Sequence, residues 1–237
     1  MHRRSVGRLA APASLVLSVL LASSAHAQTS TIDEGAFRLT IGGHDVGTET
    51  FSIRQNGSGP NAVTIAQGRV LLQNDGSQDI ASSLELSGPE LRPAAYQVTV
   101  QGGTPQKIAG RVTGGRFSAR IMSPSGEMMR EYLASDGAVL VDEGVVHQYY
   151  FVVQRAGSGG RVPVIIPQLN RQVVAVVTAS GSETLDIGGQ KVSARHYTVA
   201  PTGLPAREVW VDGEGRVLRM AVPSRQYVAI RNALPRG

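Results

Sequence analysis

Short runs in which apolar and polar residues alternate are the feature that most restricts how this chain can fold. Such runs include FRLTI (37–41), YQVTV (96–100) and REVWV (207–211), which are rich in β-branched and aromatic residues. A period of two places successive side chains on opposite faces of a β-strand, whereas a helix needs a period near 3.6. The pattern therefore predicts a mainly β protein.

Glycine pairs separate the alternating runs, at 42–43, 102–103, 114–115 and 188–189. Glycine readily adopts the positive φ angles that tight hairpin turns need. We therefore expect an antiparallel curved sheet or half-open β-barrel of roughly ten strands.

Two of the glycine-centred segments are similar to each other. LTIGGHDVGTETFSI (39–53) and LDIGGQKVSARHYTV (185–199) share the glycine pair and several apolar positions. The similarity is explained either by a duplicated hairpin or by independent convergence on the same turn chemistry, and one pair of segments does not define a repeat protein.

One segment departs from the period of two. In DEGVVHQYYFVVQRAG (142–157), apolar residues at 145, 149 and 152 and at 146, 150 and 153 form two adjacent stripes of a helix. Asp142 suits the helix N-cap and Gly157 suits the C-cap. Because Val, Tyr and Phe also favour strands, a strand is the alternative. The preferred interpretation is one helix, at about 143–156, that covers the sheet.

The N-terminal region 1–27 has the pattern of a secretory signal peptide. Three arginines precede the apolar stretch Leu15–Leu21, and Ala25-His26-Ala27 fits an A-x-A cleavage site. We expect cleavage after Ala27, a single β-rich domain over 28–237, and a location in the periplasm or outside the cell. A retained N-terminal anchor is the alternative. No later apolar stretch reaches the roughly 20 residues of a spanning helix, so no transmembrane span is predicted in the mature chain.

Composition argues against several classes of function. The chain has no cysteine, which excludes disulfides, cysteine-ligated metals and thiol nucleophiles. It has 23 basic and 18 acidic residues, and three of the basic ones lie in the predicted signal peptide, so the mature chain is close to neutral. Low net charge and an aromatic content of 5% argue against nucleic-acid binding.

Motifs for catalysis and metal binding are missing from the sequence. His44, His147 and His196 have no zinc-binding spacing. The chain also lacks a G-x-S-x-G nucleophile elbow and a phosphate-binding glycine loop. We therefore predict no catalytic residue, no metal and no cofactor. A hydrolase with His147 or His44 as the base stays open as a further alternative.

The stretch WVDGEGRVLRM (210–220) holds two acids close together, Asp212 and Glu214. Acids on an exposed loop lack the burial that tunes a catalytic pKa. Asp-Gly and a following glycine are turn formers, and both flanks alternate. We therefore predict a hairpin tip rather than a carboxylate or cation site, with Arg219 lying across from Glu208 or Trp210.

The layout resembles the periplasmic half-barrel proteins typified by the lipoprotein carrier LolA. The resemblance is carried by the G-x-x-x-G-x-E opening hairpin (Gly43 to Glu49), the helix-like segment 143–156 and the final W-x-D-x-x-G-R hairpin (Trp210 to Arg216). It implies an incomplete barrel with an apolar lining, helices that cover its mouth, and acyl chains bound between them. An arginine gates the cavity in that family, and the motifs here do not place its counterpart.

The predicted ligand site is an apolar cleft between the curved sheet and its covering helix. A sheet with one apolar face needs a cover, and an imperfect cover leaves a cleft. A fully packed core is the alternative. We predict an exported, non-catalytic protein that binds an apolar or lipid-like ligand; a cell-envelope assembly module that binds a protein partner is the second hypothesis. The predicted lining residues are Val145, Tyr149, Tyr150 and Val152 from the helix, and Leu218, Met220 and Val222, which should share one face of the final hairpin.

Overall fold

The computed structural model describes residues 29–73, 76–134 and 137–236, so the predicted signal peptide and its cleavage site lie outside the described residues. One sheet contains 15 strands, which confirms a mainly β chain and corrects the expected number of roughly ten. The expectation was too low because strands such as Ser77–Ser87 and Gly126–Leu133 carry many polar or exposed residues and alternate weakly.

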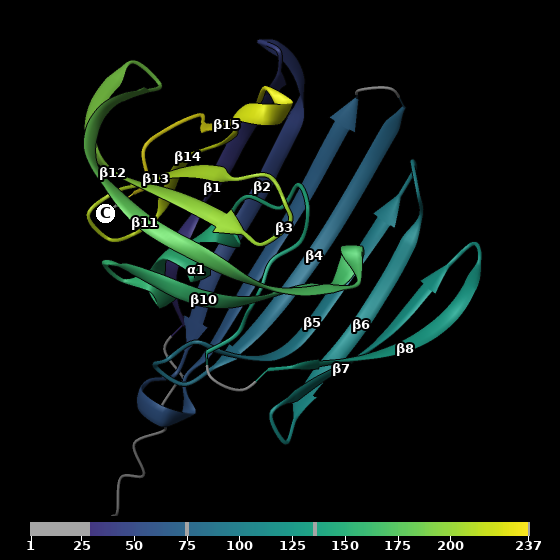
Figure 1. The fold of residues 1–237 in the computed structure, drawn as a ribbon. Coiled ribbons are helices and arrows are strands. Elements are labelled where there is room, and N and C mark those ends of the chain that lie inside the picture. Colours follow the sequence, from purple (N-terminus) through teal and green to yellow (C-terminus); the bar gives the residue numbers. More distant parts are fainter. Residues whose placement is uncertain (1–28, 74–75, 135–136, 237) are drawn as a thin grey trace, which may run out of the picture.

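The sheet consists of two meanders that meet at the first strand (Figure 1). The first meander comprises β1 (Thr29–Ile41), β2 (His44–Asn56), β3 (Val63–Gln73), β4 (Ser77–Ser87), β5 (Arg92–Gln101), β6 (Gln106–Thr113), β7 (Arg116–Ser123) and β8 (Gly126–Leu133). The second comprises β9 (Val139–Leu140), α1 (Tyr149–Ala156), β10 (Gly159–Ile166), β11 (Arg171–Ile187), β12 (Gln190–Pro201), β13 (Arg207–Val211), β14 (Val217–Val222) and β15 (Tyr227–Arg231). Short 3-10 turns lie at Gly59–Asn61, Pro167–Leu169 and Pro223–Arg225.

The two meanders join because β15 pairs with β1 in antiparallel register, for example Phe37 with Arg231 and Ile41 with Tyr227. The sheet therefore runs from β8 through β2 and β1 to β15, and on to β10 and β9. At the far edge, β9 and β10 run parallel.

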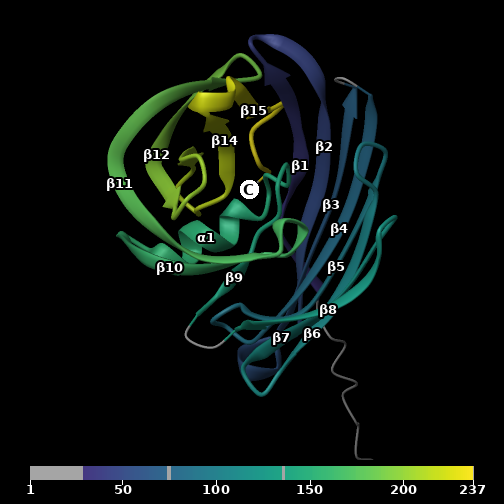
Figure 2. The ribbon, with the colours of Figure 1, turned by 45° about the vertical axis from the view of Figure 1, so that its right-hand side comes forward.

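The two parts of the sheet have different shapes. Strands β2–β8, which we call the open sheet, form a broad curved surface (Figure 1). Strand β1 and strands β10–β15, which we call the closed half, curl around α1 (Figure 2). Among the described residues, no helix is long and apolar enough to cross a membrane, and α1 has eight residues.

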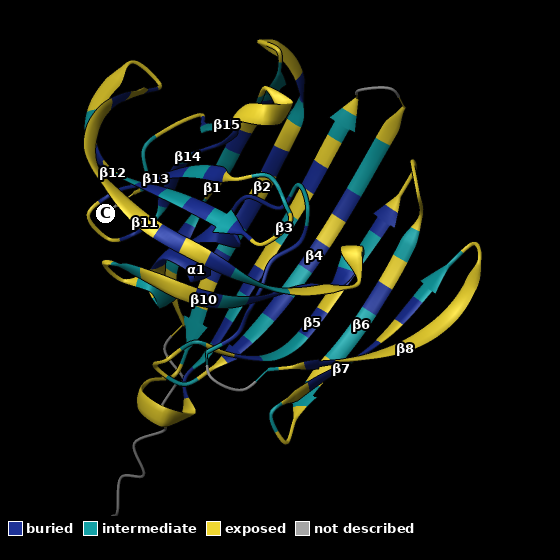
Figure 3. Ribbon diagram, in the orientation of Figure 1, coloured by how far each residue is buried: buried dark blue, intermediate teal, exposed yellow. Residues whose placement is uncertain are grey.

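Buried and exposed positions alternate along the strands (Figure 3). In β5, for example, Tyr96, Val98 and Val100 are buried. The main apolar core runs through both parts of the sheet, and a smaller cluster that includes Leu185, Trp210 and Leu218 lies on the opposite face of β11–β14.

The glycine pairs occupy hairpin turns, as the sequence predicts. At the β1–β2 turn, Gly42 and Gly43 have φ angles of 58° and 83°, and at the β11–β12 turn Gly188 and Gly189 have φ angles of 61° and 82°. Both hairpins therefore turn with the same backbone conformation, which accounts for the glycine pair that the two similar segments share.

The helix is shorter than predicted and begins at Tyr149 instead of near 143. Turns lie at 143–144 and 147–148, and Gly144 has a φ angle of 77°, which a helix does not accommodate. Gly157 closes the helix with a φ angle of 59° and donates its N–H to Val153 O at 2.9 Å, as predicted. The residues from Tyr149 to Val153 are all buried, which explains why a helix here has the composition of a strand.

Side chains tie the free end of the open sheet to the closed half. Tyr132 in β8 donates its hydroxyl to Asn170 Oδ1 at 2.9 Å. The Gln172 amide in β11 accepts the Leu133 N–H at 3.0 Å and donates to Leu133 O at 2.6 Å. These contacts fix the curvature of the sheet at its outer strand.

Candidate functional site

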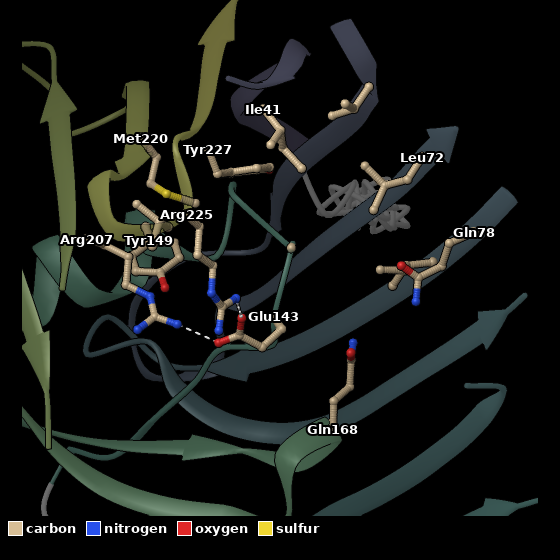
Figure 4. A pocket seen from close by; sticks show the side chains of 14 residues that line it. Ile41, Leu72, Gln78, Glu143, Tyr149, Gln168, Arg207, Met220, Arg225 and Tyr227 are labelled. Atoms are coloured by element: carbon tan, nitrogen blue, oxygen red, sulfur yellow. Dashed lines mark hydrogen bonds and ion pairs between the residues drawn. The ribbon is translucent and has the colours of Figure 1, made fainter. Parts of the chain in front are cut away.

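A pocket of about 360 Å³ lies where the open sheet meets the closed half (Figure 4). Its volume is within the roughly 300–1,000 Å³ of small-molecule sites. Strands from both parts of the sheet contribute to it, together with the loop after β9, α1 and two 3-10 turns. The apolar lining consists of Ile41, Val46, Leu72, Ile80, Met220 and Val222.

Three charged side chains lie at one end of the pocket (Figure 4). Glu143 accepts from Arg207 through Oε1 at 2.5 Å and from Arg225 through Oε2 at 2.7 Å. The Arg207 side chain is 4% exposed and also donates to Pro205 O, whereas the Arg225 side chain is 51% exposed. One carboxylate between two guanidinium groups leaves an excess of positive charge, and Arg225 is the cation that solvent reaches.

Two further polar side chains line the pocket with unused hydrogen-bonding capacity. Within the described residues, the buried atoms Tyr227 Oη and Gln168 Nε2 have no hydrogen-bond partner. Burial raises the pKa of Tyr227, so its hydroxyl stays protonated and can donate. Gln168 lies near Asp142 and lowers the pKa of that carboxyl group. Buried polar groups are usually hydrogen-bonded, so these two atoms are exceptions at the wall of the pocket.

The loop that carries Glu143 is held by a buried network around Asp142. Tyr96 donates its hydroxyl to Asp142 Oδ2, and the Gln168 backbone N–H donates to Oδ1, both at 2.8 Å. Gln148 closes the network by accepting the Asp142 N–H at 2.7 Å and donating to Tyr96 Oη at 3.2 Å. Burial raises the pKa of Asp142 to about 7, although the hydrogen bonds from Gln168 and Tyr96 lower it.

A second buried carboxylate holds the start of the helix. Glu49 in β2 accepts the Val146 N–H at 2.7 Å and the His147 N–H at 3.1 Å, and it contacts His147 Nδ1 at 2.6 Å. Both side chains are fully buried, and the His147 ring stacks on Phe51. The N-cap of α1 is Gln148, which makes no side-chain cap bond, so Asp142 is not the N-cap. Glu49, from a distant strand, instead holds the turn that leads into the helix.

The G-x-x-x-G-x-E motif of the opening hairpin has a structural explanation. Gly43 forms the turn, and Gly47 lies so close to the backbone of β3 that a Cβ atom there would overlap with Leu71 O. Glu49 then reaches the 146–147 amides. The motif positions the loop beside the pocket, and Val46, which lies within it, contributes to the pocket lining.

The predicted site residues separate into those at the pocket and those in the core. Tyr149, Met220 and Val222 line the pocket. Val152 and Tyr149 line a much smaller adjoining cavity. Val145 is 1% exposed and packs in the main core, and Tyr150 is buried at 8%.

Leu218 does not share the face of Met220 and Val222, which corrects that expectation. The register passes from Trp210–Arg219 to Val211–Val217, so Leu218 is an extra residue in β14 and forms a β-bulge. The bulge reverses the alternation: Val217, Met220 and Val222 face the main core, while Leu218 joins the cluster on the opposite face.

The acids of the 210–220 stretch form a hairpin tip, as predicted, but Asp212 is buried at 8% exposure, which corrects the expectation that both acids are exposed. Asp212 accepts the Glu214 and Arg216 N–H groups at 2.9 Å and the Arg216 Nε–H at 2.7 Å. Arg219 pairs with Trp210 across the hairpin, and its guanidinium lies 4.5 Å from the centre of the indole ring. These contacts stabilise the turn and leave Asp212 in a structural role.

Sequence patterns did not identify Glu143, Arg207, Arg225, Gln168 and Tyr227 as pocket residues. One signal was available for the supporting residue Glu49, which shares the inward face of β2 with Phe51 and Ile53. A charged residue in an apolar face is unusual and indicates a buried partner.

The histidines differ in their surroundings. His44 is exposed at the β1–β2 turn, whereas His147 is fully buried and lies outside the pocket lining. His196 stacks on Trp210 and contacts Glu208 at 2.7 Å on the outer side of the sheet. Across residues 29–73, 76–134 and 137–236, no group of three or more His, Asp or Glu side chains is arranged to hold a metal ion.

Comparison with known proteins supports the architecture. No protein-family model matches the chain, and no curated protein matches it. The crystal structure of a β-barrel-like protein of the domain of unknown function DUF1849, from Brucella abortus, is similar to this chain with a TM-score of 0.56 and 6% sequence identity. The match covers 88% of this chain and 98% of that one. At this identity the likeness shows a shared barrel-like fold.

Proposed function

We propose that this protein is an exported, non-catalytic binding protein that holds an apolar or amphipathic ligand in the pocket between the open sheet and the closed half. The observation that carries the proposal is a pocket of about 360 Å³ with an apolar wall and a charged end. Sites of this composition are typical of small-ligand binding. An acyl chain is the ligand that the resemblance to LolA-type carriers suggests.

The proposal is tested by filling the pocket. Leu72→Trp places a large ring in the pocket wall, whereas the neighbouring Leu71 is 42% exposed and points to the other face of β3. We expect Leu72→Trp to weaken binding of the neutral apolar probe N-phenyl-1-naphthylamine about tenfold or more, and Leu71→Trp to leave the affinity unchanged. Fluorescence titration measures both, and thermal unfolding checks that each variant folds.

Protein purified from its natural compartment provides a second test. Native mass spectrometry before and after lipid extraction should reveal a bound small molecule, and N-terminal sequencing should begin at Gln28. A ligand-free protein that does not bind the probe, or equal binding by both tryptophan variants, would contradict the binding proposal. A mature N-terminus at Met1 would contradict export by signal cleavage.

The alternative function, an assembly module that binds a protein partner, is favoured by one observation. Strand β8 lies at an edge of the sheet and exposes Met129 and Leu133. An edge strand can pair with an extended strand of another protein. Met129→Lys should then abolish co-purification of such a partner without changing probe binding, whereas the pocket variant Leu72→Trp should leave the partner bound.

A further inference from the structure

The polar end of the pocket differs from its apolar wall in a way that restricts the ligand further. The groups with unused hydrogen-bonding capacity there are Arg225 and Gln168, whereas Tyr227 lies beside Ile41 on the apolar side of the pocket (Figure 4). We propose that this end binds the anionic head group of a single-chain amphiphile, with Arg225 as its main contact. The inference rests on the proposed binding function and adds the chemistry of the head group.

The charges favour an anion over a cation. Both oxygens of Glu143 already face guanidinium groups, those of Arg207 and Arg225. A cationic head group would have to displace one of these partners and would meet the other, whereas an anion adds a second negative charge to a site that has an excess of positive charge.

The unused hydrogen-bonding groups also favour an acceptor-rich head group. Arg225 contacts Glu143 through Nη1 at 2.7 Å, and a guanidinium has five N–H donors, so several remain. The Gln168 side-chain NH₂ is a donor as well. A carboxylate or phosphate accepts from all of these groups, and hydrogen bonds to a charged acceptor are stronger than those to a neutral one.

Burial and hydrogen bonding separate the roles of the two arginines. The buried Arg207 is held by Glu143 and Pro205 O, so it fixes the position of Glu143. Arg225 is the last residue of the 3-10 turn Pro223–Arg225 and its side chain is half exposed, so it can turn from Glu143 toward a ligand with little rearrangement. Arg225 is therefore the residue expected to select the head group.

The size of the pocket limits the apolar part of the ligand to one chain. The pocket volume of about 360 Å³ is at the lower end of the range for small-molecule sites. The apolar wall from Ile41 and Leu72 lies away from the charged side chains in Figure 4. A chain along this wall places its head group at Arg225.

Calorimetric titration with four probes that share a dodecyl chain tests the inference. The probes are dodecanoate, dodecyl phosphate, dodecanol and dodecyltrimethylammonium, each below its micellar concentration. We expect the better of the two anions to bind at least tenfold more tightly than dodecanol, and the cation to bind most weakly. Whichever anion binds more tightly identifies a carboxylate or a phosphate as the preferred head group.

Substitutions test whether Arg225 contacts the head group. Arg225→Gln should reduce the ratio of anion affinity to dodecanol affinity about tenfold, because the positive charge that pairs with the head group is lost. Arg54→Gln is the matched control, since the Arg54 side chain is 54% exposed and pairs with Glu34 away from the pocket; its ratio should equal that of the unmodified protein.

The outcomes separate the two proposals. If dodecanol binds as tightly as both anions, or if Arg225→Gln leaves the ratio unchanged, the head-group inference is wrong while binding in the pocket stands. If none of the four probes binds and the naphthylamine probe does not bind either, the proposed function itself fails.

Discussion

The open sheet and the closed half are built from similar antiparallel hairpins, but they bury different kinds of structure. In the open sheet, a strand such as β5 buries Tyr96, Val98 and Val100 and satisfies its backbone through β4 and β6. The closed half surrounds α1 and the loop 141–148. A buried loop satisfies only some of its backbone groups internally, such as the Val145 N–H that donates to Asp142 O, so the others need polar side chains around it.

This difference explains where the buried acids lie. Glu49 accepts the amides of Val146 and His147, and Asp142 bonds to Tyr96 and to the Gln168 backbone. Two of these side chains, Glu49 and Tyr96, belong to the open sheet. The closed half therefore depends on the open sheet for the polar contacts that hold its contents, and it should be the first part to loosen when they are removed.

Removal of the Glu49 carboxylate should cause the largest loss of stability. Glu49→Ala leaves two buried amides and His147 without their acceptor, and we expect a loss of about 3–5 kcal/mol in the free energy of unfolding. Chemical denaturation measures the loss, and hydrogen exchange should show the α1 amides opening before those of β5. Thr48→Ala, on the exposed face of the same strand, is the control and should change stability by less than about 0.5 kcal/mol. Equal losses in the two variants would show that the loop does not depend on the open sheet.

A change of pH should have the next largest effect on stability, because Asp142 changes its protonation state. Its pKa is raised to about 7, so the folded state binds the proton more tightly than the unfolded state does. The resulting stability is fully present below about pH 4 and is lost as the pH rises through about 7, up to about 4 kcal/mol. Asp142→Asn should flatten this part of the stability profile, while Asp186→Asn at the exposed β11–β12 turn should not. Parallel profiles for Asp142→Asn and the unmodified protein from pH 4 to 8 would refute the assignment.

A substitution at Gly68 should have the smallest of the three effects. A Cβ atom at this position would overlap with the ring of His147, which lies over the strand beside Phe51. We expect Gly68→Ala to lower the free energy of unfolding by about 1–3 kcal/mol. Gly213→Ala is the control, because a Cβ atom there meets nothing within 4 Å. If His147→Ala does not offset the effect of Gly68→Ala in a double variant, the close approach of the two regions is not its cause.

Alternation and glycine placement were sufficient to predict much of the fold. They indicated the β class, the hairpin turns and two pocket residues, Met220 and Val222, while the helical stripe in 142–157 indicated a third, Tyr149. Leu218 was placed on the wrong face because one extra residue in β14 reverses the alternation, and a sequence does not mark where its partner strand lacks a residue.

Long-range contacts account for the rest of what the sequence did not predict. The Glu143 ion pairs join positions 64 and 82 residues apart, and the contact from Glu49 to the Val146 amide spans 97 residues. The helix begins at Tyr149 because Gly144, with a φ angle of 77°, interrupts the helical pattern that the local sequence suggested from near 143. Its end depends on Gly157, a local signal, and was predicted correctly.

The pairing of β1 with β15 has a consequence for how the chain folds. Most hairpins of the open sheet form between neighbours in sequence, but β1 must wait for the last strand before its second edge is paired. Closing a loop that includes nearly the whole chain is slow, since its entropy is lost before the contacts form. Ile41 and Tyr227 are partners in this pairing and both line the pocket. We therefore expect ligand-binding ability to emerge only in the slowest phase of refolding, after most β-structure has formed.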